Sequence, residues 1–396
     1  MLTGKTIVLG VTGGIAVYKA ADLASKLVQA GAKVRVIMTK NALEFVTPLT
    51  FEAITTNSVI TDMFNTDAEH RINHIALSEI ADVIVIAPAT ANVMAKIAGG
   101  LADDMLTTTV LATHAPVVIA PAMHTAMWEN AVTRENTAKL VKRGFHIIDP
   151  AVGRLASWGY GPGRLPDTEV IIGHINMVLG QNGDLAGKRI VVTAGGTQEP
   201  IDPVRIISNR SSGKMGYAIA QAARDRGAEV TLITTHTSIS KPVGVKIIAA
   251  ETAVQMKTEV EKSVVDSDVL IMAAAVADYQ VAEVSTAKIK KESGDLTLKL
   301  VHTPDILAEV KGNFLKIGFA AESQDLIANA RKKVEKKKLD LIVANDITEE
   351  HSGFGADTNK VVLIGKDGMP ESLPVMSKRD VADRILDIVV RLLVNR

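Results

Sequence analysis

The sequence has no cysteine among its 396 residues, and this absence excludes several kinds of chemistry. A chain without thiols forms no disulfide, builds no thiolate metal site and has no cysteine nucleophile. It also has no apolar run of the roughly eighteen residues that span a bilayer. Its 44 lysines and arginines equal its 44 aspartates and glutamates, so the overall charge gives no sign of a nucleic-acid or membrane-surface partner. The opening residues MLTGKTIVLGVTGG enter a strand pattern without a cleavable signal, and we expect a cytoplasmic protein.

Two signatures of nicotinamide-dependent enzymes are missing as well. The pattern GxGxxG occurs nowhere in the chain, which disfavours a dinucleotide site. None of the four tyrosines is followed by a lysine at the fourth position, so the Tyr-x-x-x-Lys pair of short-chain dehydrogenases is absent. A nicotinamide reductase is therefore disfavoured.

The patterns that are present predict two α/β domains in tandem. Strand-like apolar runs alternate with amphipathic helices in both halves, which is typical of doubly wound parallel sheets of the Rossmann-like or flavodoxin-like kind. A helix expected over 168–179 is followed by Gly-Gln-Asn-Gly-Asp, a polar break typical of a linker. We therefore predict domains at 1–183 and 184–396, and 47% hydrophobic residues provide ample material for both cores.

The first half begins with a strand, a glycine turn, a helix and a second strand. The strand covers Thr6–Val11, and the turn Thr12-Gly13-Gly14 is a candidate phosphate site because backbone N–H groups there are unobstructed. A later strand, Asp82–Ala87, leads into the loop PATAN (88–92), where Thr90 and Asn92 lie at a carboxyl end that favours ligands. Both residue types are also ordinary helix caps.

The second half contains the most distinctive stretch, TAGGTQEPIDPVRIISNRSSGKMG (193–216). It follows a short strand at Arg189–Val192 and opens a helix near Met215, so its backbone N–H groups suit a phosphate. Small residues would let the backbone approach a ligand and polar residues would surround it: Gly195, Gly196 and Gly213, with Asn209, Ser211, Ser212 and Lys214.

This stretch closely resembles the signature of phosphopantothenate–cysteine ligases, and the resemblance covers 186–396. The segments GVTGGIAVYK, IMTKNALEFV, NHIALS, APATANVMAKIAGGLADDML and PAMHTAMW resemble, in the same order, flavin-containing cysteine decarboxylases, over residues 4–180. That family decarboxylates 4′-phosphopantothenoylcysteine with FMN. Together the halves resemble bifunctional proteins of coenzyme A biosynthesis, with the decarboxylase first and the ligase second.

For the first half, the resemblance implies a catalytic His74, although a lone histidine is more often structural. It implies substrate contacts at His124 and Met127, with His124 replacing the family's asparagine. In the flap LASWGYGPGRLPD (155–167), Ser157 stands where the family has a cysteine that protonates the intermediate. A hydroxyl is a far weaker acid than a thiol, so this step is expected to be slow or to use Tyr160. The implied FMN contacts are Gly13, Gly14, Thr39, Phe45, Pro88, Thr90 and Asn92.

For the second half, the resemblance implies that CTP, with Mg²⁺, activates 4′-phosphopantothenate as an acyl-cytidylate that reacts with cysteine. Asn209 and Lys288 match catalytic positions, and Asp278 and Phe319 match positions around the cytosine. Lys333 and Lys337 lie four apart on one expected helix face and would grip the triphosphate, although such a run can equally be a solvated surface. No metal ligands are indicated. The substrate-binding set also includes Gly195, Gly196, Ser211, Ser212, Gly213 and Lys214.

Two other interpretations stay open. Ser157 and His124 allow an active ligase fused to a non-catalytic flavin-binding scaffold. Decarboxylation of a peptide's C-terminal cysteine is disfavoured because it leaves the second half without a role. The resemblance further implies a homo-oligomer, a dodecamer assembled from trimers of one half and dimers of the other.

Overall fold

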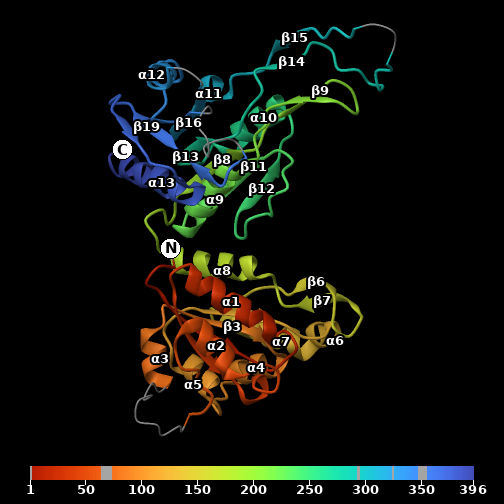
Figure 1. Ribbon diagram of the computed structural model, residues 1–396, viewed down its shortest axis with the longest axis vertical. Helices are drawn as coiled ribbons and strands as arrows, with labels where there is room; N and C mark the ends of the chain where they lie inside the picture. The colour runs from red at the N-terminus through yellow and green to blue at the C-terminus, as the bar shows by residue number, and fades with distance from the viewer. Residues whose placement is uncertain (1, 64–73, 292–294, 323–324, 347–354) are drawn as a thin grey trace. The chain divides into compact units, whose positions relative to one another are not determined.

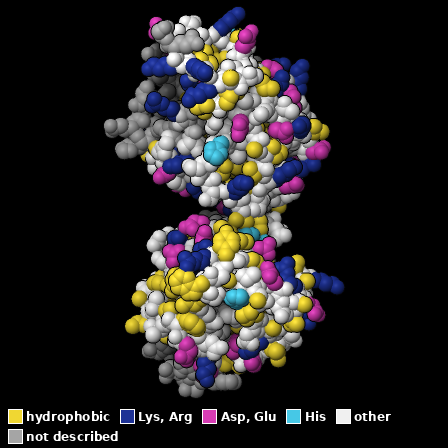
Figure 2. Space-filling model, turned by 90° about the vertical axis from the view of Figure 1, so that its right-hand side faces the viewer, with side chains coloured by type: hydrophobic (Ala, Val, Ile, Leu, Met, Phe, Trp, Pro, Cys, Tyr) yellow, Lys and Arg dark blue, Asp and Glu magenta, His cyan; other side chains and the backbone are white. Residues whose placement is uncertain are grey.

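The computed structural model describes residues 2–63, 74–291, 295–322, 325–346 and 355–396. The chain divides into two compact units, Met1–Leu179 and Gly180–Arg396. No helix in the described ranges is long and apolar enough to cross a membrane. Figure 2 shows acidic and basic side chains interspersed on the visible face of each unit, in keeping with the balanced composition.

The first unit is built on a five-stranded sheet in the order β2-β1-β3-β4-β5, in which all neighbours are parallel. The strand order reverses between β1 and β3, and such a switch point leaves a crevice at the carboxyl ends of the strands. The strands are β1 (Thr6–Val11), β2 (Lys33–Met38), β3 (Val83–Ala89), β4 (Val117–Pro121) and β5 (His146–Ile147). The helices are α1 (Val17–Gln29), α2 (Pro48–Thr55), α3 (His74–Ile80), α4 (Ala91–Gly99), α5 (Met105–Ala112), α6 (Thr125–Glu129), α7 (Ala131–Lys142) and α8 (Thr168–Gly180), with a 3₁₀ turn at Lys40–Ala42.

The continuous apolar runs of these strands are explained by helices on both faces of the sheet. Alternate residues of β1 enter different cores: Ile7 and Leu9 pack into one hydrophobic cluster and Val8 into another. α1 covers the first of these clusters with a stripe at helical spacing that includes Val17, Ala20 and Leu27. An antiparallel hairpin of β6 (Ala151–Arg154) and β7 (Tyr160–Arg164) precedes α8.

The second unit contains an eight-stranded sheet in the order β12-β11-β8-β13-β16-β17-β19-β20. The first six strands run parallel, whereas β19 and β20 pair antiparallel, so the predicted parallel sheet carries an antiparallel edge. The strands are β8 (Arg189–Ala194), β11 (Glu229–Thr234), β12 (Lys246–Ala249), β13 (Val269–Met272), β16 (Leu315–Glu322), β17 (Leu341–Asp346), β19 (Val361–Gly365) and β20 (Pro370–Ser372). The helices are α9 (Lys214–Asp225), α10 (Ala253–Ser263), α11 (Ile306–Glu309), α12 (Leu326–Lys337) and α13 (Lys378–Val394).

Three two-stranded pairs extend this unit beyond its main sheet. Figure 1 shows β14 and β15 as part of an arm that projects from the sheet. The pairs are β9 (Gln198–Pro200) with β10 (Ile206–Ser208), β14 (Tyr279–Val281) with β15 (Leu300–His302), and β18 (Thr358–Asn359) with β21 (Met376–Ser377).

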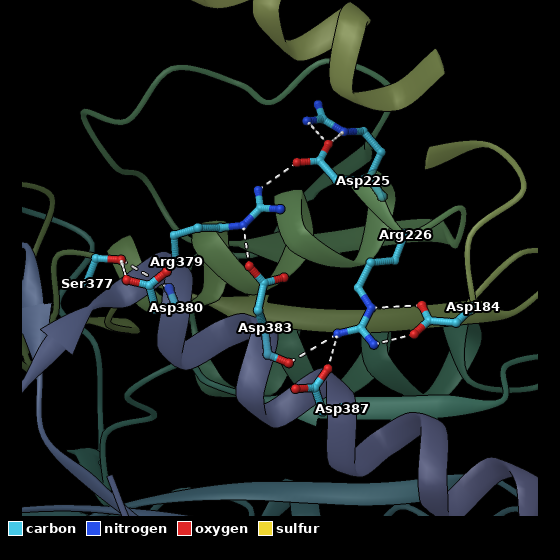
Figure 3. A network of polar contacts seen from close by, with 9 residues as sticks. Asp184, Asp225, Arg226, Ser377, Arg379, Asp380, Asp383 and Asp387 are labelled. Carbon is cyan, nitrogen blue, oxygen red and sulfur yellow. Dashed lines mark hydrogen bonds and ion pairs between the residues drawn. The ribbon is translucent and has the colours of Figure 1, made fainter. Parts of the chain in front are cut away.

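A buried ion-pair network joins α9 to α13 (Figure 3). The Asp225 carboxylate is fully buried and accepts hydrogen bonds from Arg224 Nε at 2.8 Å and Arg379 Nη1 at 2.6 Å. Arg379 Nε also donates to Asp383 Oδ2 at 3.0 Å. Burial alone would lower the pKa of Arg379, but the two carboxylates raise it. The network therefore fixes the last helix against the helix that follows the glycine-rich stretch.

Candidate functional site

A cavity of about 790 Å³ lies at the carboxyl ends of β1, β3 and β4 in the first unit. This volume is in the range of small-molecule sites. It is bounded by the turn after β1, the end of β3, the loop after β4 and the β6–β7 hairpin. The predicted residues that line it are Gly13, Gly14, Pro88, Thr90, His124, Met127 and Ser157.

Thr12 holds two walls of the cavity together. Its side chain is fully buried, and its hydroxyl donates to Pro88 O at 2.7 Å and accepts from Thr90 N at 3.0 Å. Thr90 Oγ1 in turn accepts from Val93 N at 3.3 Å and caps α4. Thr90 therefore fits both of its sequence interpretations, because one residue caps a helix and lines the cavity.

The glycine turn after β1 offers backbone donors to the cavity. In the described part of the chain, Gly14, Ile15 and Ala16 donate no backbone hydrogen bond. A Cβ on Gly13 would lie 2.4 Å from Asn41 Cβ, so a larger residue would displace this turn. Free N–H groups beside the start of α1 suit an anion such as a phosphate monoester.

The β6–β7 hairpin lies directly on the loop after β4. Met123 N donates to Gly163 O at 2.9 Å, and a Cβ on Gly163 would lie 2.2 Å from Met123 O. A Cβ on Gly161 would lie 2.6 Å from Thr125 Oγ1. The glycines of β7 thus permit the close contact that brings the hairpin turn, with the exposed Ser157, to the cavity.

His124 caps α6 through its imidazole. Its Nδ1 accepts a hydrogen bond from Ala126 N at 3.1 Å, which assigns the ring proton of the neutral side chain to Nε2. The side chain can therefore present a donor, but not a second acceptor, to a ligand in the cavity.

Four predicted residues of the first unit do not line this cavity. His74 is the first residue of α3 and is half-buried. Thr39 precedes the 3₁₀ turn, Phe45 is about half exposed, and Asn92 lies in the first turn of α4. Their roles stay predictions.

In the second unit, the distinctive stretch converges on the carboxyl ends of β8 and β13, where the strand order also reverses. Gly195 and Gly213 have φ angles of 88° and 80°, which favour glycine, and a Cβ on Gly195 would lie 2.0 Å from Thr235 Oγ1. Asn209 Nδ2 donates to Ala275 O and Val276 O, both at 3.2 Å. The predicted glycine turn, the Asn209 side chain and the segment after β13 therefore meet at one place.

The start of α9 is arranged around small and polar residues. Gly213 N and Lys214 N donate weakly to Ser211 Oγ and Ser212 Oγ, at 3.4 and 3.5 Å. The Lys214 ammonium points to the segment before β18, where it binds Asp357 Oδ1 at 2.6 Å and Gly355 O at 2.9 Å. Lys214, which was predicted from the sequence to bind substrate, is therefore paired with the carboxylate of Asp357. A Cβ on Gly196 would lie 2.7 Å from Asn209 O.

Asp202, which was not predicted from the sequence, positions the segment that carries Lys288. Asp202 is buried, and its carboxylate accepts hydrogen bonds from the backbone N–H groups of Val204, Arg205 and Ile289. Burial alone would raise the pKa of Asp202, but these donors and the Arg205 guanidinium hold it below its ordinary value. Lys288 itself is exposed. The string PIDPVR was a signal, because an aspartate before a turn often accepts local backbone N–H groups.

The remaining predicted residues are more dispersed. Asp278 is exposed, and Phe319 is half-buried in β16 against the core of the unit. Lys337 Nζ forms an ion pair with Asp305 Oδ1 at 2.9 Å, and Lys333 lies one turn earlier on α12. Within the described ranges, no group of three histidine, aspartate or glutamate side chains could hold a metal ion.

The comparisons with known proteins agree with this two-part organisation. Residues 1–180 match the family model Flavoprotein, and residues 185–393 match the DNA/pantothenate metabolism flavoprotein C-terminal domain. The coenzyme A biosynthesis bifunctional protein CoaBC of Bacillus subtilis is 47% identical over 398 residues, covering 99% of this chain and 98% of its own. The protein of the same name from Mycobacterium tuberculosis is 44% identical, covering 98% and 97%.

Among solved structures, the C-terminal domain of a CoaBC protein is 39% identical, with a TM-score of 0.47, covering 54% of this chain and all of its own. The FMN-dependent cysteine decarboxylase SpaF is 35% identical, with a TM-score of 0.38, covering 43% and 95%. The matches to relatives run nearly from end to end, and both family models are found in the same order. The chain therefore belongs to the family of coenzyme A biosynthesis bifunctional proteins.

Proposed function

We propose that this chain catalyses two consecutive steps of coenzyme A biosynthesis. Residues 184–396 would join 4′-phosphopantothenate to cysteine with CTP through an acyl-cytidylate, and residues 1–183 would decarboxylate the product to 4′-phosphopantetheine with FMN. The observation that carries this proposal is the near-full-length match to bifunctional relatives at 42–47% identity. We expect both reactions to take place in the cytoplasm.

The first unit has groups that fit a flavin mononucleotide. The backbone N–H groups of residues 14–16 are available for its phosphate, and the cavity extends from them along Pro88 and Thr90. When bound, the flavin supplies a hydride acceptor for the thiol-bearing carbon, which provides the electron sink that loss of CO₂ requires. His74, Thr39, Phe45 and Asn92 would complete this site as the resemblance implies.

The chain's own residues would bind and orient the substrate. The Nε2–H of His124 would donate to the substrate carboxylate, while its Nδ1 stays engaged at the start of α6. The hairpin would cover the reacting end and exclude water, and Ser157 or Tyr160 would deliver the last proton. Exposed apolar side chains that line the cavity, such as Ile15 and Met127, support an interface with another copy of the chain.

In the second unit, the turn at Gly195–Gly196 and the start of α9 would hold the anionic groups. Asn209 would bind the acyl-cytidylate, and Lys288 would stabilise negative charge that develops during amide formation. Asp278 and Phe319 would recognise the cytosine, while Lys333 and Lys337 would contact the triphosphate. Mg²⁺ would arrive with the nucleotide phosphates, as is usual for this ion. The full assembly would be a dodecamer of trimers and dimers.

The test is a discontinuous assay on purified full-length protein after its visible spectrum has been recorded. The protein is given 4′-phosphopantothenate, cysteine, Mg²⁺ and either CTP or ATP, and pyrophosphate and CO₂ are followed separately. We expect a yellow protein that forms both products with CTP. Absence of pyrophosphate with either nucleotide would refute the ligase.

A second candidate is an active ligase with a flavin-binding scaffold. The observation that favours it is Ser157, which lines the cavity at the position expected for the proton-donating cysteine. Bound flavin and pyrophosphate without CO₂, also when 4′-phosphopantothenoylcysteine is supplied directly, would establish this alternative.

A further inference from the structure

The cavity of the first unit carries an unbalanced positive charge. Lys19, Arg154 and Arg164 line it, and its described lining includes no aspartate or glutamate. None of the three cations forms an ion pair within the described ranges. Cations gathered in a partly enclosed site without counter-charge attract anionic ligands.

Lys19 occupies a position that disfavours a cation. It lies in the first turn of α1, at the positive end of the helix dipole, and this turn has no acidic residue. An anion in the cavity would offset the repulsion between the Lys19 ammonium and the helix dipole, because it would interact favourably with both.

A glycine on the neighbouring strand of the hairpin leaves space for the Arg164 side chain. It ends β7, and its side chain crosses Gly153 on β6, where a Cβ would lie 2.7 Å from Nη1 and 3.1 Å from Cδ. The guanidinium is half-buried and has no hydrogen-bond partner in the described part of the chain. A planar guanidinium matches phosphate oxygens with two parallel N–H donors. Arg154 differs, because it stacks on the exposed Trp158 ring, 4.4 Å from its centroid.

The cavity thus has separate donors for two anionic groups. The backbone N–H groups of residues 14–16 suit the flavin phosphate, which leaves the two cations for another ligand. Resting on the proposed function, we propose that Lys19 and Arg164 bind the terminal phosphate of the acyl-cysteine substrate. This subsite selects a phosphorylated substrate over the same compound without phosphate, and over a peptide ending in cysteine.

The experiment compares 4′-phosphopantothenoylcysteine with pantothenoylcysteine, which lacks the phosphate. Full-length wild type, Lys19→Gln and Arg164→Gln are tested with both. The control is Lys139→Gln, which removes an exposed cation of α7 that does not line the cavity. Substrate binding is measured through the flavin spectrum, which reports on this cavity alone, and turnover through CO₂. Affinities for FMN and riboflavin are measured in parallel.

We expect wild type to prefer the phosphorylated compound, and each cavity variant to reduce this preference on the order of tenfold to a hundredfold. The loss should appear mainly in KM and in spectral affinity, with the dephosphorylated compound and the control unaffected. Equal losses with both compounds would overturn the proposal, because they indicate a carboxylate or positioning role. Loss of the preference for FMN over riboflavin would also overturn it, since the bound phosphate would then be that of the flavin.

The spectral titration separates this proposal from the proposed function. A wild type that binds the phosphorylated compound selectively but releases no CO₂ would contradict decarboxylation and still support the subsite. A wild type that binds both compounds equally would overturn the subsite, whether or not CO₂ is released.

Discussion

The carboxylate of Asp202 accepts a hydrogen bond from the backbone N–H of Ile289 at 3.2 Å, although the two residues are 87 positions apart. Arg205 strengthens the same contact, because its Nη2 donates to Ile289 O at 3.0 Å. The backbone N–H and C=O of Ile289 therefore both bind side chains of the turn after β9. These two contacts attach the segment that carries Lys288 to that turn.

The Asp202 contact should be pH-dependent. Because the folded-state pKa of Asp202 is below its ordinary value, its stabilising contribution is fully present above the unfolded pKa, about 4, and is lost as pH falls through the folded value. We expect Asp202→Asn to speed amide hydrogen exchange over 285–291 at neutral pH, and the difference from wild type to shrink below about pH 4. The exposed Asp266→Asn change is the control and should have no such effect. Equal exchange in wild type and Asp202→Asn at neutral pH would contradict the assignment.

Thr12→Val should loosen the flavin cavity. The change leaves Thr90 N without its acceptor in a buried place and removes one of the two hydrogen bonds to Pro88 O, which still accepts from the backbone N–H of residue 12. The unpaired donor costs roughly 1–3 kcal/mol of stability. Both tryptophans, Trp128 and Trp158, lie in the first unit, so their fluorescence follows its unfolding in urea. We also expect weaker flavin binding.

The matched control for this prediction is Thr109→Val. Thr109 is equally buried, but its hydroxyl donates to Met105 O within α5, away from the cavity. Flavin affinity should be unchanged in this variant. Equal losses of flavin in both variants would show that general destabilisation, and not the Thr12 contact, is responsible.

Asp225→Asn should destabilise the second unit strongly. The substitution removes the carboxylate that balances Arg224 and one of the two carboxylates that balance Arg379, and a broken buried pair costs about 3–5 kcal/mol. Asp387→Asn, at a part-exposed contact to Arg226, should cost about 0–1 kcal/mol. Calorimetry records the unfolding transitions of both units. Tryptophan fluorescence identifies the transition of the first unit, so the other transition is assigned to the second. Similar costs for both changes would contradict the assignment of Asp225 as the buried centre of the network in Figure 3.

The sequence predicted elements whose formation depends on local chemistry. The final helix was expected over 378–394 and occupies Lys378–Val394, and β1 occupies the expected Thr6–Val11. The turns at Gly13 and Gly195 were predicted because glycine there satisfies a backbone requirement. The two antiparallel edge strands β19 and β20 were not predicted, because an apolar run such as VVLIG (361–365) does not specify the direction of its neighbour.

Residues whose role depends on contacts between segments far apart in the sequence were not predicted. Arg164 belongs to a glycine-rich segment, and only the packing of the hairpin on the loop after β4 places it beside a cavity that also includes Lys19. Lys19 follows the helical pattern of α1 and gives no local sign of its surroundings. Asp202 likewise lies in a turn, and its contact with Ile289 depends on how the β14–β15 segment folds back.

Ser157→Cys should accelerate decarboxylation if protonation limits the rate. A thiol is more acidic than a hydroxyl by several pKa units, so we expect an increase on the order of tenfold or more in the formation of 4′-phosphopantetheine. Tyr160→Phe tests the other candidate acid, whose side chain is 80% exposed. An unchanged rate in Ser157→Cys would indicate that a different step is limiting.

His124 should have separable structural and binding roles. Asn is a good helix cap, so His124→Asn should preserve the start of α6 and restore an amide facing the substrate, whereas His124→Ala should cost about 1 kcal/mol. Trp128 lies within α6 and reports this difference by its fluorescence. We expect substrate affinity to survive in the Asn variant and to fall in the Ala variant. Equal unfolding curves for both variants would exclude the cap.

The serine at the hairpin turn also affects how the protein would respond to oxidation. Under the proposed function, the cysteine that is consumed and the 4′-phosphopantetheine that is released are both thiols. The protein that binds them has no sulfhydryl group of its own. Such a chain cannot be captured by its own reactants in a mixed disulfide, nor inactivated by glutathione disulfide at the turn over its cavity. Oxidation of the small thiols would then reduce flux without forming any disulfide on the protein.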